Sequence, residues 1–266
     1  MPEEVNQLSE VLRNLAEGRE GKAALPALKI SDLVTSFCNL RATMTSTTCI
    51  LSPETIVARA LSIDAEFTAW RTALPPNLLY DTVTQGEPDC TAHAGYYYIW
   101  PNLGFAVLHI TSWMTLILIH GIVIQQIGLL RKEKANEPDE HIKDHESQTQ
   151  QSTTLILLLI DHICASVRYH LSLCSTNSSV SSTARIEPLS IPCSASINAI
   201  LKPLFVAGDS SLCPPSTRGW IVEQLRNIGT NMGVKQALYL ADGIVRRDSS
   251  SDLLLDDRVA LVHRSK

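Results

Sequence analysis

The feature that most constrains the fold of this chain is its central stretch from Leu103 to Leu130, which contains no charged side chain. As an α-helix, at about 1.5 Å per residue, this stretch would be roughly 42 Å long. A helix that is apolar on all sides belongs either in a lipid bilayer or in the middle of a protein core. The stretch therefore leaves two interpretations, a membrane span and a buried central helix.

The sequence contains observations in favour of each interpretation. Basic residues follow the stretch, as they do beside many membrane spans, at Arg131, Lys132 and Lys134. Polar side chains are scattered within it, and in hydrocarbon each would need a hydrogen-bonding partner: His109, Thr111, Ser112, His120, Gln125 and Gln126. We therefore expect a buried helix and no membrane, and we keep a membrane-associated protein anchored by residues 103–130 as the alternative. In that alternative, the segment around Asp161 is a second, poorer span.

Helical periodicity also dominates the remainder of the chain, and no alternating run of β-branched residues with hairpin turn signals is present. The spacing of apolar residues predicts helices over about 3–16, 25–40, 53–72, 152–173, 217–228 and 232–245. Residues 197–206 are a further apolar segment, which Pro203 is expected to interrupt. We expect an all-α, irregular fold of about eight helices around the central one. It divides into an N-terminal helical segment at 1–50, a main domain at 51–248 and a C-terminal tail at 249–266. Within the main domain, polar composition predicts a loop at 133–151 and a linker at 175–188.

The clearest helix in the sequence follows Ser52. Ser52 is a favourable N-cap, and Pro53 fits the first helical position because an N–H there would have no partner in the helix. The proline pair at 75–76 ends the helix, since proline removes hydrogen-bond donors and disfavours helical geometry in the residue before it. We expect Arg59 and Glu66 to face water. The face that we expect to be buried carries apolar residues at alternating spacings of four and three: Ile56, Ala60, Ile63, Phe67 and Trp70.

Charge and cysteine usage restrict the functional class. The net charge of -5 at pH 7 leaves no basic excess to attract a phosphate backbone, so bulk electrostatics predicts no nucleic-acid binding. The seven cysteines form no C-x-x-C pair, which argues against both a zinc site and a disulfide framework. The N-terminus also lacks the apolar core of a secretory signal. Together these observations predict a reduced compartment, the nucleus or the cytoplasm.

Four stretches carry a resemblance to a known family: 58–83 (ARALSIDAEFTAWRTALPPNLLYDTV), 96–124 (beginning YYYIWPNLGF), 160–171 (IDHICASVRYHL) and 201–244 (ending GTNMGVKQALYLADGI). In this order they resemble the C-terminal half of the regulatory domain of fungal zinc-cluster transcription factors, whose DNA-binding module holds two zinc ions with six cysteines. The most specific pieces are the helix that ends in Leu-Pro-Pro, the run ICASV at 163–167 and the closing stretch. The resemblance covers most of the chain.

The resemblance implies an all-helical domain that tunes activation or repression of transcription in the nucleus. It implies protein partners, such as a full-length transcription factor or a second copy of the chain, or an effector bound along the central helix. The six-cysteine cluster is absent, so we expect no specific DNA binding by this chain alone and no metal, cofactor or catalytic site. Arg168 stands where the family usually has proline, and the central helix has leucine and histidine where arginines and acids are common. These departures affect the details of partner binding.

Eight side chains are candidate contacts with an effector or a partner: Trp70, Trp100, His109, His120, Asp161, His162, Arg168 and Trp220. For the tryptophans, anchoring of the core is the alternative interpretation. Asp161 and His162 are neighbours whose side chains point about 100° apart on a helix, so they do not form a catalytic relay directly. No serine or cysteine in an elbow motif accompanies them. We therefore expect no catalysis by Asp161 and His162, for which a structural role as polar residues at a crowded helix interface is the alternative to a contact. Asp161 and Arg168 lie seven residues apart and should share one narrow polar stripe.

Two further patterns suggest chemistry that we do not expect. His141 and His145 are spaced like two zinc ligands on one helical face, but a third ligand is lacking, so we interpret them as part of a solvated loop. Residues 223–244 superficially resemble a helix-turn-helix. Because Ala237 and Leu238 stand where a recognition helix needs base-contacting side chains, we expect a packed helical hairpin there.

Overall fold

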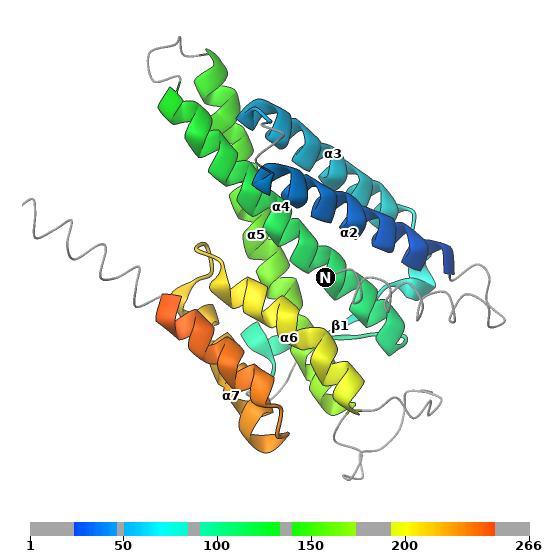
Figure 1. Cartoon of the computed structure of the whole chain (residues 1–266). Helices are drawn as coiled ribbons and strands as arrows, with labels where there is room; N and C mark the ends of the chain where they lie inside the picture. Colours follow the sequence, from blue (N-terminus) through cyan, green and yellow to red (C-terminus); the bar gives the residue numbers. More distant parts are fainter. Residues whose placement is uncertain (1–23, 47–50, 85–90, 134–139, 174–192, 248–266) are drawn as a thin grey trace, which may run out of the picture. The chain divides into compact units, whose positions relative to one another are not determined.

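The computed structural model in Figure 1 describes residues 24–46, 51–84, 91–133, 140–173 and 193–247. The predicted helix over 3–16, the linker at 175–188 and the tail at 249–266 lie outside the described residues. The helices are α2 (Ala24–Thr45), α3 (Pro53–Thr72), α4 (Leu103–Glu133), α5 (Glu140–Ser172), α6 (Cys193–Asp209), α7 (Pro215–Asn231) and a C-terminal helix over 235–247. Two short 3-10 helices and two strands complete the elements: η1 (Pro76–Leu78), β1 (Asp81–Thr84), η2 (His93–Gly95) and β2 (Tyr96–Ile99). The predicted all-α, multi-helix fold is confirmed.

The chain forms two compact units. Unit 1 combines the chain up to Tyr80 with Trp100–Leu159, and unit 2 combines Asp81–Ile99 with the chain from Ile160 onward. Helix α5 therefore contributes its first part to unit 1 and its second part to unit 2. The predicted boundary at residue 50 lies inside unit 1, between α2 and α3.

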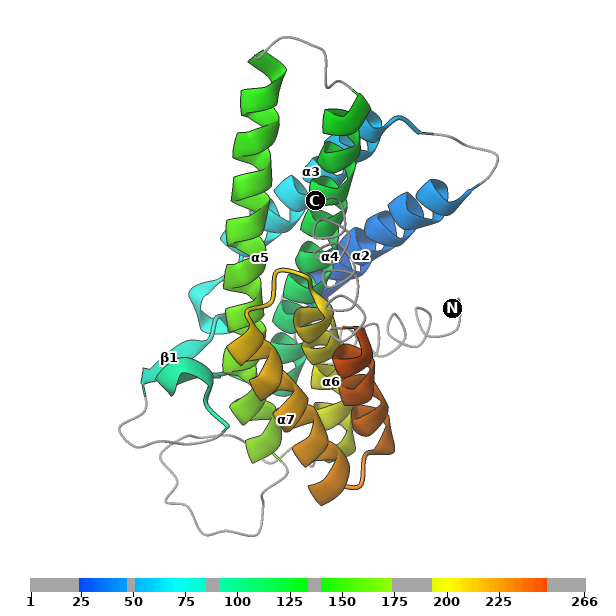
Figure 2. The ribbon, with the colours of Figure 1, turned by 90° about the vertical axis from the view of Figure 1, so that its left-hand side faces the viewer.

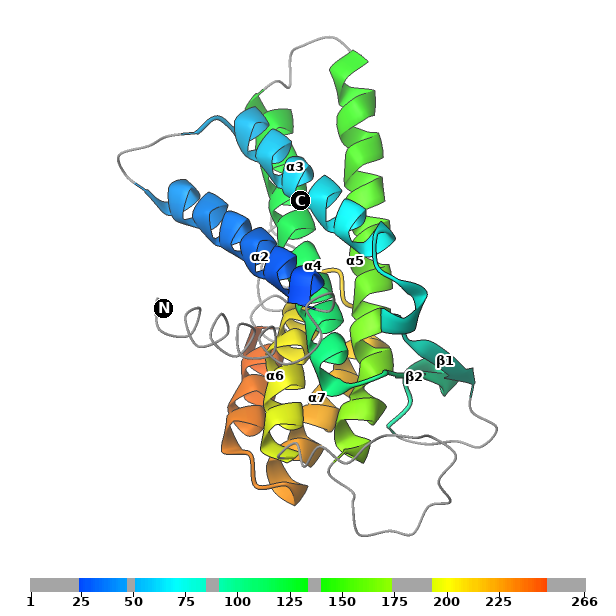
Figure 3. The ribbon, with the colours of Figure 1, turned by 90° about the vertical axis from the view of Figure 1, so that its right-hand side faces the viewer.

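Helix α3 of unit 1 begins and ends where the sequence predicts. The Ser52 hydroxyl accepts a hydrogen bond from the Thr55 N–H at 3.3 Å, and a proline occupies the first turn. The helix ends at Thr72, shortly before the proline pair. Arg59 and Glu66 face solvent, and the predicted stripe is buried: Ile56, Ala60, Ile63, Phe67 and Trp70. Figures 1 and 3 show α2 and α3 lying against each other and against α4.

Helix α4 is the predicted central helix of unit 1. Before residue 131 its exposed residues are Gly104, Gly121, Gln125 and Leu129. Polar side chains of α4 find partners within the helix: the Ser112 hydroxyl donates to the His109 carbonyl at 2.7 Å, and the Thr115 hydroxyl donates to the Thr111 carbonyl at 2.8 Å. Bonds to the preceding turn satisfy hydroxyls in apolar surroundings. By length and composition alone α4 and α5 could each cross a membrane, and 61% of the apolar window of α4 is buried inside the protein.

The predicted loop at 133–151 is wrong over most of its length, because α5 already begins at Glu140. Between Lys143 and Gln151, most side chains of α5 are exposed to solvent. Charged and polar residues are compatible with a helix when they face water, so a polar composition does not by itself predict a loop. The hydroxyls of Thr149 and Thr153 donate to the carbonyls four residues before them, within the helix.

The two-stranded ribbon of unit 2 is a second difference, because the sequence predicts an all-α fold and no strand. Strand β1 pairs with β2 in antiparallel register, with Thr82 opposite Tyr98 and Thr84 opposite Tyr96 (Figure 3). Neither four-residue strand, DTVT or YYYI, has the alternation of apolar and polar residues that predicts a strand. Pairing with β1 therefore gives the tyrosines of β2 a defined backbone conformation.

In unit 2, α6, α7 and the C-terminal helix lie side by side (Figure 2). Helix α6 continues through Pro203, where the sequence predicts an interruption. Gly233, with a φ of +72°, lies in the turn between α7 and the C-terminal helix. A side chain at Gly229 would overlap with Leu238, so glycine allows α7 and the C-terminal helix to approach closely. The predicted packed helical hairpin is confirmed.

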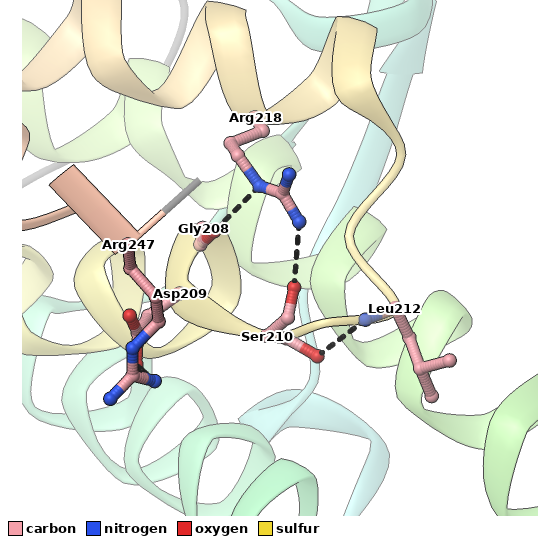
Figure 4. A network of polar contacts seen from close by, with 6 residues as sticks. All are labelled: Gly208, Asp209, Ser210, Leu212, Arg218 and Arg247. Carbon is pink, nitrogen blue, oxygen red and sulfur yellow. Dashed lines mark hydrogen bonds and ion pairs between the residues drawn. The ribbon is translucent and has the colours of Figure 1, made fainter. Parts of the chain in front are cut away.

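Arg218 of α7 closes the turn that follows α6 (Figure 4). Its Nε donates to the Gly208 carbonyl and its Nη2 to the Ser210 carbonyl, both at 3.1 Å. Carbonyls at the C-terminus of a helix lack partners within the helix and attract a cation of this kind. Asp209, from the same turn, pairs with Arg247 of the C-terminal helix. Both neighbouring helices therefore hold the end of α6 in place.

Candidate functional site

The eight candidate side chains fall into two groups of four, one in each unit. The group in unit 1 is buried: Trp70, Trp100, His109 and His120. The group in unit 2 is half-exposed: Asp161, His162, Arg168 and Trp220. A partner can reach the second group without unfolding the core, whereas the first group is closed to it.

In unit 1, Trp100 and His109 are the centre of a buried aromatic cluster. Their ring centroids are 4.8 Å apart, and the Trp70 ring lies 5.6 Å from His109. Tyr80 and Trp113 complete the cluster, at 4.8 Å and 5.7 Å from Trp100. Tilted aromatic pairs at these spacings stabilise a core beyond the area that they bury. The packing supports the core interpretation for these residues.

His120, three turns further along α4, belongs to a separate polar chain. Its Nδ1 lies 3.0 Å from the Ser152 hydroxyl of α5, and its Nε2 lies 3.4 Å from a carboxylate oxygen of Asp64 in α3. The order of serine, histidine and aspartate is that of a hydrolase relay. Ser152, however, is completely buried in the interior of a helix, where its hydroxyl is closed to a substrate. The polar chain links three helices of unit 1.

In unit 2, strand β2 brings two tyrosines against α5. The Tyr98 hydroxyl and His162 Nδ1 are 2.6 Å apart, which is hydrogen-bonding distance. The Arg168 guanidinium lies over the Tyr97 ring, 4.2 Å from its centroid. A guanidinium stacked on a ring gains a cation–π interaction while its N–H edge points away from the ring. The ribbon thus orients a histidine and an arginine of α5.

A second pair of unit 2 joins Trp220 of α7 to His93 of η2, with ring centroids 4.9 Å apart. Partial burial lowers the pKa of His93, and the nearby Asp161 raises it by less. Asp161 and Arg168 lie seven residues apart on α5 and share one half-exposed stripe, as their spacing predicts. We call this surface the α5 site and define it by seven residues, of which Tyr98 is buried and the others are partly exposed: His93, Tyr97, Tyr98, Asp161, His162, Arg168 and Trp220.

Cys164, which lies on α5 between the charged residues of the site, is not an activated nucleophile. Its side chain is fully buried. Burial raises the pKa of its thiol well above the ordinary value, and Cys213 and Asp161 raise it further. The reactive form of cysteine is the thiolate, which this environment disfavours. The α5 site therefore offers binding chemistry: aromatic rings, a guanidinium and a carboxylate.

Metal binding has no support in the described part of the chain, where no three histidine, cysteine or carboxylate side chains gather. His141 and His145 lie one turn apart on α5 and not in the predicted loop. The expectation that the chain has no metal site stays a prediction.

Sequence reasoning misses three residues of the α5 site: His93, Tyr97 and Tyr98. Tyr97 and Tyr98 stand in an aromatic run, and no local spacing pairs Tyr98 with His162, which is 64 residues away. His93 has no distinguishing neighbour in the sequence. The one available signal is the strand propensity of tyrosine, which favours an extended conformation for the run.

Comparison with known proteins finds no relative of this chain. No family model, no curated protein and no solved structure matches it. The class of protein is therefore argued from its residues, its helical fold and the α5 site.

Proposed function

We propose that the chain is a helical regulatory module of transcription in the nucleus, which acts through protein contacts or an effector and carries no DNA-binding zinc cluster of its own. The observation that carries the proposal is the α5 site. Three of the stretches that resemble the fungal regulatory domain contribute to it: 96–124 with the tyrosines, 160–171 with the charged stripe and 201–244 with Trp220. Stretches that are distant in the sequence contribute to one half-exposed surface of unit 2.

The composition of the α5 site favours binding over catalysis. Arg168 and Asp161 place opposite charges on one helical stripe, and Tyr97 and Trp220 add aromatic rings. Tryptophan, tyrosine and arginine are the residue types that contribute most to the energetics of protein contacts. The buried thiol of Cys164 is held in its protonated form. We therefore propose a contact surface and no enzymatic activity.

A tethered reporter tests the proposal. The whole chain is fused to an unrelated DNA-binding domain, and reporter expression is compared with that of the DNA-binding domain alone. We expect the fusion to raise or lower expression several-fold. We expect Arg168→Gln to remove most of this effect, because it removes both the charge and the cation–π contact with Tyr97. Arg59→Gln, at an exposed arginine of α3, is the matched control and keeps the effect.

Two outcomes of the reporter assay contradict the proposal. If the fusion leaves expression unchanged, the chain has no transcriptional effect of its own. If Arg168→Gln and Arg59→Gln reduce the effect equally, the α5 site is not the contact surface. Immunoblotting of each variant separates a loss of contact from a loss of protein, and we expect equal abundance because Arg59 is exposed and Arg168 is partly exposed.

The alternative function is a membrane-associated protein anchored by residues 103–130. The observation that favours it is that α4 and α5 are each long and apolar enough to cross a bilayer. The packing of α2 and α3 against α4, and the polar chain around His120, support a core helix instead. Extraction of cell membranes with alkaline carbonate distinguishes the two, because an anchored protein stays in the pellet and an unanchored one is released.

A further inference from the structure

The C-terminal helix, orange-red in Figure 1, has an inner face that packs into unit 2 and an outer face that does not. Ala237, Ala241 and Ile244 are buried on the inner face. On the opposite side of the helix, Lys235, Tyr239, Asp242 and Arg246 recur at spacings of four, three and four and form one exposed stripe. We call these four residues the outer stripe.

Tyr239 is the unusual member of the outer stripe. Its side chain is 72% exposed, the highest value among the large apolar side chains in the described part of the chain. An exposed aromatic ring between charged residues is typical of a contact surface, because the ring can bury a large area while the charges set its orientation. The outer stripe therefore has the composition of a small interface.

We propose that a second copy of this chain binds to the outer stripe through an antiparallel, two-fold packing of the two C-terminal helices. A two-fold axis makes each contact occur twice, once in each direction. In the antiparallel arrangement, Lys235 faces the partner's Asp242 while Asp242 faces the partner's Lys235. The two Tyr239 rings then meet close to the axis, midway between the two ion pairs.

The order of charges along the outer stripe selects this partner and this orientation. With Lys235 two turns before Asp242, the stripe is complementary to itself only when the two helices run in opposite directions. A parallel pairing would place lysine against lysine, which is unfavourable. Asp242 is available for the contact, because its ion pair with Arg226 is long, 3.9 Å, and the side chains of both residues are more than half exposed.

The size of the outer stripe predicts a weak and reversible dimer. One exposed helical face is small compared with the interfaces of permanent dimers, and small interfaces belong to transient complexes. The inference does not require the proposed function, since it concerns pairing of the chain with itself through residues outside the α5 site. Loss of the dimer and loss of the reporter effect are therefore distinguishable results.

Charge reversal provides the test. The purified whole chain and its variants are studied by sedimentation equilibrium over a wide range of concentrations. We expect the average mass of the wild type to rise toward that of a dimer with concentration. Lys235→Glu and Asp242→Lys should each stay monomeric, because each puts like charges opposite one another twice in the dimer. An equimolar mixture of the two variants should regain the dimer, because one ion pair is then the native pair of Asp242 with Lys235 and the other is restored with reversed polarity.

The mixture makes the test specific to the antiparallel pairing. A wild type that stays monomeric throughout overturns the inference, as does a dimer that survives both charge reversals. A mixture that fails to associate also overturns it, provided that both variants have the circular dichroism spectrum and melting temperature of the wild type. Arg59→Glu, a charge reversal on α3, is the control and should dimerise like the wild type.

Discussion

Both units contain a buried histidine paired with a serine, and the two pairs differ in their surroundings. In unit 1, His120 Nδ1 lies 3.0 Å from the Ser152 hydroxyl, and its Nε2 lies 3.4 Å from Asp64, which is partly open to solvent. In unit 2, His170 Nδ1 lies 3.0 Å from the Ser196 carbonyl oxygen, and the Ser196 hydroxyl donates back to the His170 carbonyl at 3.1 Å. The first pair extends to a carboxylate near the surface, whereas the second is enclosed between α5 and α6.

Histidine therefore connects neighbouring helices in both units, but with different hydrogen-bonding surroundings. Burial lowers the pKa of His170 to about 4, although the hydrogen bond to Ser196 raises it. The native form of unit 2 therefore contains a neutral imidazole, and its packing depends on that protonation state. Unit 1 instead contains the aromatic cluster around Trp100. The two units are expected to respond to different perturbations.

The largest expected effect is on the aromatic cluster of unit 1. Trp100→Ala removes a fully buried ring and is expected to lower the free energy of unfolding by about 3–5 kcal/mol. Trp220→Ala, at a half-exposed ring of the α5 site, is the matched comparison and should cost about 1 kcal/mol. Urea denaturation followed by circular dichroism measures both. Equal losses of unfolding free energy in the two variants would contradict the assignment of Trp100 to the core and of Trp220 to a contact surface.

The next effect is a pH dependence located in unit 2. Above its ordinary pKa of 6.5, His170 is neutral in the folded and the unfolded chain; below it, only the unfolded chain takes up the proton until the pH reaches about 4. Stability should therefore fall as the pH falls from 6.5 to 4, by about 3 kcal/mol in total for a shift of this size.

Hydrogen exchange of peptides from α6, measured across this pH window, locates the effect of His170. His170→Gln should flatten the pH dependence, whereas His145→Gln, at a half-exposed histidine of α5, should preserve it. A pH dependence that survives His170→Gln would contradict the role of the buried imidazole.

A smaller effect distinguishes two glycines of α7. Gly229→Ala should destabilise unit 2 by about 1–3 kcal/mol, because the added methyl group overlaps with Leu238 and the C-terminal helix has to shift. Gly219→Ala should stabilise the same helix by about 0.5–1 kcal/mol, since it is exposed and its Cβ would meet no atom within 4 Å. Thermal melting of both variants measures whether each substitution raises or lowers the melting temperature. Shifts of the same sign would show that α7 and the C-terminal helix do not pack closely at Gly229.

The smallest effect belongs to the helix cap of unit 1. Ser52→Ala removes the acceptor of the Thr55 N–H bond at the start of α3 and should cost about 1 kcal/mol. Ser52→Asp should keep most of the stability, because a carboxylate also caps the helix and favours its positive end. Chemical denaturation is sensitive enough to separate the two variants. Identical losses would mean that the cap contributes nothing to α3.

The fold could be predicted where local chemistry decides it, and α3 and α5 show the limit. The apolar stripe, the N-cap and the proline pair of α3 all act within a few residues, so sequence spacing predicts both the element and its buried face. The start of α5 could not be predicted, because a polar helix and a polar loop have the same composition when both face water. The ribbon of β1 and β2 depends on pairing between segments, which no single segment encodes.

The candidate site was predictable only in part, for a related reason. Asp161 and Arg168 could be placed on one stripe from their spacing, but their aromatic neighbours come from β2 and η2. Tryptophan and histidine are candidates in both units, and only tertiary packing shows that those of unit 1 are buried. A tryptophan or histidine in an apolar sequence thus supports a core role and a contact role equally until its exposure is known.

Light scattering of the purified chain in detergent-free buffer tests most directly whether α4 is a core helix, on which the account of both units depends. We predict a monodisperse, helical species, a monomer at low concentration that associates weakly as the concentration rises. Recovery of folded protein only in detergent micelles would contradict the account, because it would mean that the apolar surface of α4 is covered by lipid and not by α2 and α3.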